Sequence, residues 1–257
     1  MAAPDGRSEI AVVLVRPREE GNVGAAARAM ANMGLSRLIL VEPAPELGGV
    51  ARAFAVGARQ VLDGSVRAGS LREALAIFPR VVATTSTRDR RQSVPLIRPR
   101  ELPAALAADP PGTPVALVFG PEVGGLTNEE LALANLVVTV PCAPEQPTLN
   151  LAQAVLLLAY EMYQAKLEGP NPPHPRSAHP LGPQEAPAST AEVDGLFDHA
   201  AALLGRIGFE RDSTFAGVIR DLRAAAARAR LASREVAILR GICRRAAHAL
   251  DRGRITS

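Results

Sequence analysis

Polar side chains that could do chemistry lie in three short stretches of the chain. In GNVGAAARAM, the guanidinium of Arg28 stands among small residues that would let a bulky charged ligand approach it. In VFGPEVGGLTNEE, Gly120 ends an apolar run and Glu122 follows it. In TLNLAQA, Thr148 precedes Asn150, whose amide can both donate and accept hydrogen bonds. Each stretch alone also suits a structural role: an exposed helix arginine, a glycine turn or a helix cap.

The first stretch can also be interpreted as a dinucleotide-binding turn. Gly21, Gly24 and Ala27 give G-x-x-G-x-x-A, and Glu42 ends the next apolar run where a ribose-binding acid belongs. However, residues 16–20 separate the preceding strand from the first glycine, so the turn is not tight. Two of these five residues are glutamates, which would repel a pyrophosphate. The sequence therefore disfavours a nicotinamide site, although it leaves that alternative open.

The elements that must position these residues alternate between strand and helix from residue 10 to about residue 166. Short β-branched runs predict strands at residues 10–15, 37–41, 81–85, 115–119 and 137–140. Helical periodicity predicts helices at residues 22–33, 49–58, 70–78, 100–108, 127–134 and 149–167. This alternation predicts an α/β fold, with a parallel sheet that has helices on both faces.

Local signals predict how the key helices begin. Asn22 is a good N-cap residue for the first helix, Thr127 and Glu130 form a capping-box pattern, and Thr148 is placed to cap the helix that follows it. At 100° per residue, the face of the first helix toward the sheet consists of Val23, Ala26, Ala27 and Met30. Arg28 then points away from the sheet. Gly120, at a strand end, leaves room for a ligand against the backbone.

The chain divides into three predicted parts: a domain over residues 1–167, a proline-rich linker over 168–190 and a helical domain over 191–257. The helical domain has predicted helices at about 191–205, 214–230 and 233–251. Residues 206–257 contain 12 arginines and 5 acidic residues. This excess of positive charge indicates either a nucleic-acid-binding surface or a solvated helix face.

Composition excludes several other classes of protein. The chain has 257 residues, of which 47% are hydrophobic and 21% charged, as in soluble globular proteins. Two cysteines give neither a disulfide framework nor zinc spacing, and His174 and His179 lie in the proline-rich linker, so no metal site is expected. The polar N-terminus and the lack of a bilayer-length apolar run predict a cytoplasmic protein that does not enter a membrane.

In order and spacing, the three stretches resemble the SPOUT superfamily, specifically its TrmH-like RNA 2′-O-ribose methyltransferases. The pattern N-x-G-x-x-x-R is met by Asn22, Gly24 and Arg28, and NMGL follows at residues 32–35. The pattern F-G-x-E-x-x-G-L is met over residues 119–126, and TLNLAQA matches S-L-N-L-A-x-A. The resemblance covers about residues 8–166. The C-terminal REVAILRGICRRA is similar to the extension of the TrmJ-type enzymes, which methylate the ribose at position 32 of the tRNA anticodon loop.

The resemblance implies a deep trefoil knot on the C-terminal side of the sheet, S-adenosylmethionine as methyl donor, and a homodimer with composite active sites. The implied catalytic residues are Asn22, Arg28, Glu122, Thr148 and Asn150. The implied cofactor pocket consists of Thr85, Ser86, Thr87, Gly120, Val140, Thr148 and Leu149. The residues expected to contact RNA are Arg16, Arg28, Arg244 and Arg245. Arg28 would reach the site of the partner subunit.

The resemblance also implies the chemistry, which is an in-line attack of a ribose 2′-oxygen on a methyl carbon. A guanidinium is a poor base, so we expect Arg28 to orient a phosphate and stabilise the developing oxyanion. The chain departs from the family at Thr148, where serine is usual, and at Gln146, where the closest branch often has tyrosine. The substrate is expected to be tRNA. Methylation of rRNA or of another tRNA position, or RNA binding without catalysis, stays open.

Overall fold

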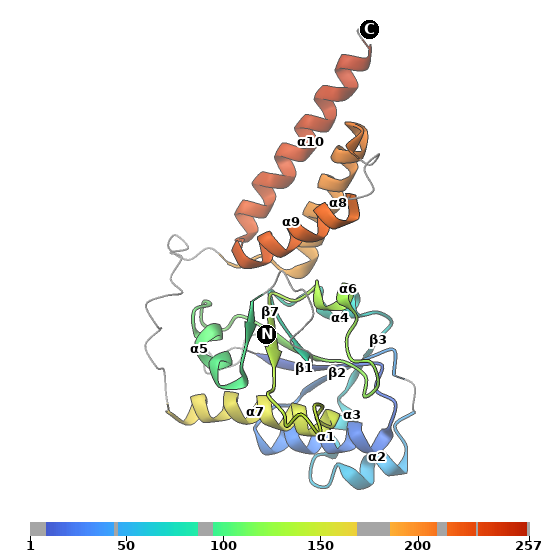
Figure 1. Ribbon diagram of the computed structural model, residues 1–257, viewed down its shortest axis with the longest axis vertical. Coiled ribbons are helices and arrows are strands. Elements are labelled where there is room, and N and C mark those ends of the chain that lie inside the picture. Colours follow the sequence, from blue (N-terminus) through green and yellow to red (C-terminus); the bar gives the residue numbers. More distant parts are fainter. Residues whose placement is uncertain are drawn as a thin grey trace. The chain divides into compact units, whose positions relative to one another are not determined.

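A computed structural model of the chain describes residues 9–43, 46–86, 95–168, 186–209, 215–229 and 231–255. The chain divides into two compact units, residues 1–180 and 181–257. The first unit contains the sheet, and the described part of the second contains three helices (Figure 1). Most of the predicted linker, including His174 and His179, lies outside the described residues. The predicted domain boundaries therefore stay a prediction.

Seven parallel strands form the sheet of the first unit. They are β1 (Ile10–Val15), β2 (Arg37–Val41), β3 (Val66–Ala68), β4 (Arg80–Thr85), β5 (Leu96–Ile97), β6 (Val115–Phe119) and β7 (Leu136–Thr139). Their order is β3-β2-β1-β6-β4-β7-β5, and every neighbouring pair is parallel. The five predicted strands are all present, with bounds that agree to within one residue. The other two, β3 and β5, have three and two residues, which is too short to show a period.

Helices cover both faces of this sheet. They are α1 (Glu20–Asn32), α2 (Gly49–Phe54), α3 (Arg59–Asp63), α4 (Leu71–Leu75), α5 (Leu102–Ala107) after the 3-10 turn η1 (Pro99–Glu101), α6 (Asn128–Leu131) and α7 (Leu151–Glu168). One core cluster joins α1, α2, α3, α5 and α7 to one face, and a second joins α4 and α6 to the other. Figure 1 shows these two layers. The predicted α/β fold is confirmed, and burial on both faces explains why the strands are continuously apolar.

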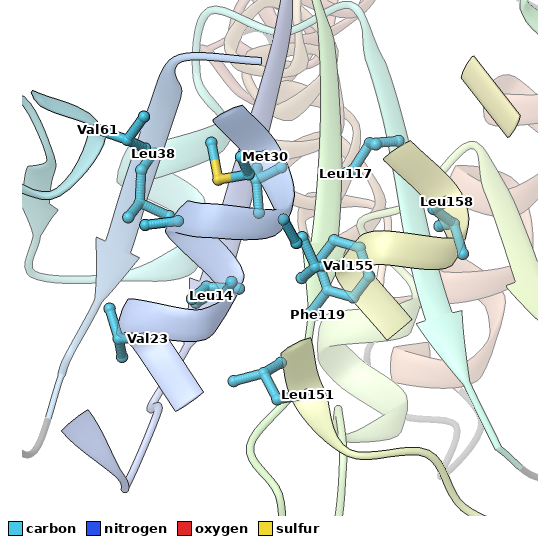
Figure 2. Packing of buried hydrophobic residues seen from close by; sticks show 14 of the residues in the cluster. Leu14, Val23, Met30, Leu38, Val61, Leu117, Phe119, Leu151, Val155 and Leu158 are labelled. Carbon is cyan, nitrogen blue, oxygen red and sulfur yellow. The ribbon is translucent and has the colours of Figure 1, made fainter. Parts of the chain in front are cut away.

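The core beneath α1 and α7 positions the residues of the candidate site. Figure 2 shows Val23 and Met30 of α1 and Val155 of α7 packing beside strand residues that include Leu14 and Phe119. The predicted buried face of α1 is confirmed, because Val23, Ala26, Ala27 and Met30 are each fully buried. Both helices are therefore held against the central strands β1 and β6.

The strand order separates this sheet from a dinucleotide-binding one. In a nicotinamide-binding sheet the fourth strand lies beside the first, whereas here β6 lies between β1 and β4. Likewise, β7 lies between β4 and β5, so two late strands are each inserted between strands that precede them. The knot that the resemblance implies would require the chain to thread through a loop on the C-terminal side of this sheet. However, residues 87–94, on the path from β4 to β5, lie outside the described residues, so the knot stays a prediction.

Gly24 shows what the small residues of α1 do. A Cβ atom at this position would lie 2.1 Å from the carbonyl oxygen of Ala51 and 2.9 Å from the Cβ of Phe54, both in α2. The glycine thus allows the two helices to approach closely. The interpretation that it clears space around Arg28 is wrong, because that space is filled by α2.

We expect Gly24→Ala to lower the free energy of unfolding by about 1–3 kcal/mol, because the added methyl group must displace the α2 backbone. Urea denaturation would measure the change. Gly49→Ala is the matched control, since a Cβ there meets no atom within 4 Å. Equal stability of the two variants would contradict this account of the α1–α2 contact.

The second unit contains α8 (Thr190–Arg206), α9 (Phe215–Ala229) and α10 (Ser233–Ile255), which confirms the three predicted helices. A buried cluster of this unit contains Ala188, Leu196 and Val236, with Cys243 packed against it. Leu239, within α10, is 38% exposed. None of the described helices in either unit is both long and apolar enough to cross a membrane.

Candidate active site

The carboxyl ends of β6, β4 and β7 lie side by side. β4 pairs with β6 through Ala83 and Val118, and with β7 through Thr85 and Thr139. Ligands of parallel α/β proteins bind outside such strand ends. Four of the predicted cofactor residues meet at this edge, namely Thr85, Ser86, Gly120 and Val140. Thr87, another predicted member of the pocket, lies outside the described residues.

The glycine-rich loop after β6 folds back onto the strand that it leaves. A Cβ at Gly120 would lie 2.4 Å from the nitrogen of Leu126 and 2.6 Å from the carbonyl carbon of Gly125. Gly124 and Gly125 have φ values of +83° and +63°, which glycine adopts without strain. The space beside Gly120 is therefore filled by the loop's own backbone. A ligand therefore has no room on the side where a Cβ would point, and the contact of the Gly120 backbone with the cofactor stays a prediction.

The capping box at the end of this loop is confirmed. The backbone nitrogen of Thr127 donates to Oε2 of Glu130 at 2.7 Å, and the nitrogen of Glu130 donates to Oγ1 of Thr127 at 3.2 Å. These reciprocal bonds satisfy N–H groups at the start of α6. They also fix where the glycine loop ends.

Glu122, inside this loop, is bound to the segment that begins α1. Its Oε1 accepts a hydrogen bond from Nδ2 of Asn22 at 2.8 Å, and its Oε2 accepts one from the backbone nitrogen of Arg18 at 3.1 Å. The prediction that Asn22 caps its own helix is therefore wrong. Glu19 is the N-cap residue, and its side chain forms no capping bond. The carboxylate of Glu122 takes the amide of Asn22 instead.

Asn150 extends this arrangement from the other side. Its Nδ2 donates to Oδ1 of Asn22 at 2.9 Å, while its Oδ1 accepts from the backbone nitrogen of Ala152 at 2.9 Å. The nitrogen of Asn150 also donates to Oε1 of Gln153 at 3.1 Å. Asn150 thus caps α7 and contacts a distant residue at once. The prediction that Thr148 caps this helix is wrong, because α7 begins only at Leu151.

Glu122, Asn22 and Asn150 form a hydrogen-bonded line, here called the polar line. An ionised carboxylate can only accept, so it fixes the Nδ2 group of Asn22 toward itself. The Oδ1 atom of Asn22 is then left to accept from Asn150. Burial raises the pKa of Glu122, but hydrogen bonds from Asn22 and from backbone groups outweigh this and hold the pKa below its usual value. Glu122 is therefore ionised at neutral pH and orients its neighbours.

We expect Glu122→Gln to destabilise the protein at pH 7, since a glutamine side chain has one acceptor oxygen for two donors. The lowered pKa means that the carboxylate contributes stability above its unfolded-state pKa and loses it as the pH falls through the folded-state value. The difference in melting temperature between wild type and variant should therefore shrink in acid, below the ordinary glutamate pKa. A difference that persists undiminished to the acid limit would contradict the assigned ionisation.

Arg28 stands apart from the polar line. It lies six residues after Asn22, or about 9 Å along the helix. Its side chain is exposed on the outward face of α1, and within the described part of the chain no hydrogen bond or ion pair engages it. A guanidinium in this position is available to a ligand or to another subunit.

The other predicted residues are distributed as follows. Thr148 and Leu149 are exposed in the segment between β7 and α7, and Arg244 and Arg245 are exposed on α10 of the second unit. Arg16 is engaged by Glu130 and Glu42 of its own chain, which leaves its predicted RNA contact without support.

Among the described residues there is no group of three metal-ligating side chains. Sequence reasoning missed Gln153, although its place three residues after Asn150 is a capping spacing.

Known proteins match this chain along almost its whole length. The tRNA (cytidine/uridine-2′-O-)-methyltransferases TrmJ of Pectobacterium atrosepticum and Escherichia coli K12 are each 39% identical to it, over 91% of this chain and 94% and 93% of theirs. The crystal structure of TrmJ from Z. mobilis ZM4 matches with a TM-score of 0.75 and 33% identity, over 91% of this chain and 96% of that one. A probable methylase family protein from Haemophilus influenzae Rd KW20 matches with a TM-score of 0.59 and 31% identity, over 95% and 98%.

Family models divide the chain in the same way as its two units. Residues 191–255 match the model of the tRNA methyltransferase TrmJ C-terminal domain, and residues 9–160, which contain the polar line and Arg28, match the SpoU rRNA Methylase family model. The chain therefore belongs to the SpoU rRNA Methylase family and is a methyltransferase with a TrmJ-type C-terminal domain.

Proposed function

We propose that this methyltransferase moves a methyl group from S-adenosylmethionine to the ribose 2′-hydroxyl of nucleotide 32 in tRNA. The observation that carries the proposal is the polar line at the carboxyl edge of the sheet, together with an available Arg28 on the same helix. The names of the 39% identical relatives support tRNA and 2′-O transfer to cytidine or uridine. A tRNA substrate also supports the expected cytoplasmic location.

The residues at the strand ends suit S-adenosylmethionine. This donor has a cationic sulfonium and no pyrophosphate, so it needs an apolar slot for its adenosyl group and nearby backbone polar groups. Val140 and the 38% exposed Leu149 supply apolar surface. Thr85, Ser86 and Thr148 supply hydroxyl groups, and residues 140–150 supply backbone groups outside regular helix or strand. When bound there, the cofactor would provide an electrophilic methyl group.

The protein's own contribution is to position the nucleotide and stabilise charge. A ribose hydroxyl attacks well only as its proton leaves, and negative charge then develops on the 2′-oxygen. A guanidinium is a poor base, so Arg28 orients a phosphate and stabilises that oxyanion rather than taking the proton. The polar line holds Asn150 at the start of α7, where its amide can contact the ribose or the donor.

A homodimer would bring Arg28 to the site where it acts. The outward face of α7 carries apolar residues at helical spacing, namely Leu156 at 40%, Tyr160 at 44% and Leu167 at 63% exposure. α1, which carries Arg28, packs beside α7 on the same face of the sheet. A second copy that covers the stripe would receive Arg28 near its own polar line.

Methylation of rRNA is the second candidate, because the matching family model is described for rRNA. Incubation of the purified protein with labelled S-adenosylmethionine and with tRNA or rRNA separates the two. We expect label in tRNA alone. Label in rRNA alone would favour the second candidate, and tight RNA binding without transfer would indicate a non-catalytic protein. Thermal stabilisation by NAD but not by S-adenosylhomocysteine would revive the nicotinamide alternative.

The exposed arginines of α10 give a separate prediction about RNA binding. Arg244→Glu with Arg245→Glu should weaken tRNA binding by about tenfold or more at low salt and flatten its salt dependence, because phosphate contacts are lost. Filter binding across a salt series would measure this. The matched control is Arg52→Glu with Arg67→Glu, which makes the same charge change at exposed positions of the first unit. Equal losses in both variants would indicate only a nonspecific effect of net charge.

A further inference from the structure

Arg16, the residue after β1, joins three segments through its guanidinium. Nη1 and Nη2 lie 2.5 and 3.0 Å from Oε1 and Oε2 of Glu130, a two-bond arrangement that holds both groups in one plane. Oε2 of Glu42 lies 3.6 Å from the same guanidinium. The side chain of Glu130 is only 14% exposed. The end of β1, the end of β2 and the start of α6 therefore meet at one cation.

The backbone at this junction is strained. Arg16 and Glu42 have φ values of +46° and +44°, in the left-handed region that is unfavourable for residues with a Cβ atom. Each still extends its strand pairing, because the nitrogen of Arg16 donates to the oxygen of Val41 at 2.8 Å and that of Glu42 to the oxygen of Ala68 at 3.1 Å. Strain of this kind persists where surrounding contacts impose it, and it is frequent at functional sites.

Glu130 connects this junction to the glycine loop. It closes the capping box with Thr127, which directly follows that loop. β1 and β6 are paired with Leu14 opposite Phe119, so Arg16 and the loop leave neighbouring strands at the same level. At the loop's other side, Glu122 is bound to Arg18 and Asn22. Residues 16–22 thus hold residues 120–130 at two points.

We propose that Arg16 is a positioning residue for methyl transfer, which holds the glycine loop through Glu130 so that Gly120 and Glu122 keep their places in the site. The inference rests on the proposed function. It assigns Arg16 to the loop beside the donor pocket rather than to RNA. In support, burial raises the pKa of Glu130, but its bonds to Arg16 and Thr127 outweigh this and lower the pKa below its usual value.

A double-mutant cycle tests the proposal. Arg16→Gln removes the cation, whereas Glu130→Gln removes the charge but keeps a side chain that can complete the capping box. We expect Arg16→Gln to weaken S-adenosylhomocysteine binding by about tenfold in calorimetry, to raise the KM for the donor similarly and to leave tRNA affinity unchanged. The double variant should be no weaker than Arg16→Gln alone, since both changes break one interaction.

The matched control is Arg37→Gln, which removes an arginine of similar exposure from its ion pair with the more exposed Glu9 at the opposite end of the sheet. Hydrogen exchange supplies a readout that is independent of the donor: residues 120–130 should exchange faster in Arg16→Gln but not in Arg37→Gln. Unchanged exchange and donor affinity would overturn the proposal, as would a loss confined to tRNA binding. If the wild-type protein bound no S-adenosylhomocysteine, the proposed function would fail first, while the exchange result would still report on the loop.

Discussion

Replacing Arg28 with alanine is expected to lower kcat for methyl transfer by about 10²- to 10³-fold, the range seen when one donor to a developing oxyanion is removed. The melting temperature should stay close to that of the wild type, because the side chain is exposed and makes no contact that holds the described fold together. Single-turnover transfer from labelled donor to tRNA would measure the rate. The binding of S-adenosylhomocysteine in the absence of tRNA should be unaffected, since Arg28 acts on the nucleotide.

Arg28→Lys separates charge from shape. A lysine keeps the positive charge but loses the planar fork that contacts two phosphate oxygens at once. We expect activity between that of wild type and alanine. Full activity of the lysine variant would contradict the need for the fork, and full activity of the alanine variant would remove Arg28 from the mechanism. Arg59→Ala, at an exposed position of α3, is a matched control.

The largest expected effect on stability comes from a buried ion pair at the opposite end of the sheet. Arg80, the first residue of β4, donates from Nε to Oδ2 of Asp109 at 2.7 Å and forms a second bond from Nη2 to Oδ1. Both side chains are only 7% exposed. Arg80→Met is expected to lower the free energy of unfolding by about 3–5 kcal/mol, because the carboxylate stays buried without the guanidinium. Urea denaturation would measure the loss.

Removing both charges gives a different result from removing one. A double variant, Arg80→Met with Asp109→Leu, should recover most of the lost stability, since no uncompensated charge is left buried. The control Arg52→Met breaks the pair with Asp63, in which both side chains are about 60% exposed, and should cost at most about 1 kcal/mol. Equal effects of Arg80→Met and Arg52→Met would contradict the importance of burial.

Much of the fold could be predicted because both faces of the sheet are covered. Runs such as residues 10–15 and 115–119 are continuously apolar, so the predicted bounds match the strands. β3, β5 and α3 have two to five residues each, too few to show a period. The strand order could not be predicted, because it depends on which late strand is inserted between which early ones.

The three residues of the polar line could be singled out in the sequence, but their contacts could not be predicted. Spacing placed Asn22, Glu122 and Asn150 in three motifs, yet they are separated by 100 and 128 positions, and nothing local shows that they bond to one another. Gly24 and Gly120 were interpreted as space for a ligand. Their neighbours are backbone atoms of α2 and of the returning loop, which the sequence pattern does not reveal.

The most direct test of the account is to locate the methyl group. Purified tRNA would be incubated with the enzyme and S-adenosylmethionine. One portion would be digested to nucleosides to identify the methylated nucleoside, and a second would be cut into nuclease fragments whose mass spectra locate it. We predict a 2′-O-methylated cytidine or uridine at position 32, formed by the wild type and strongly reduced with Arg28→Ala. A methyl group on a base, or no methylation of tRNA alongside methylation of rRNA, would contradict the proposed function.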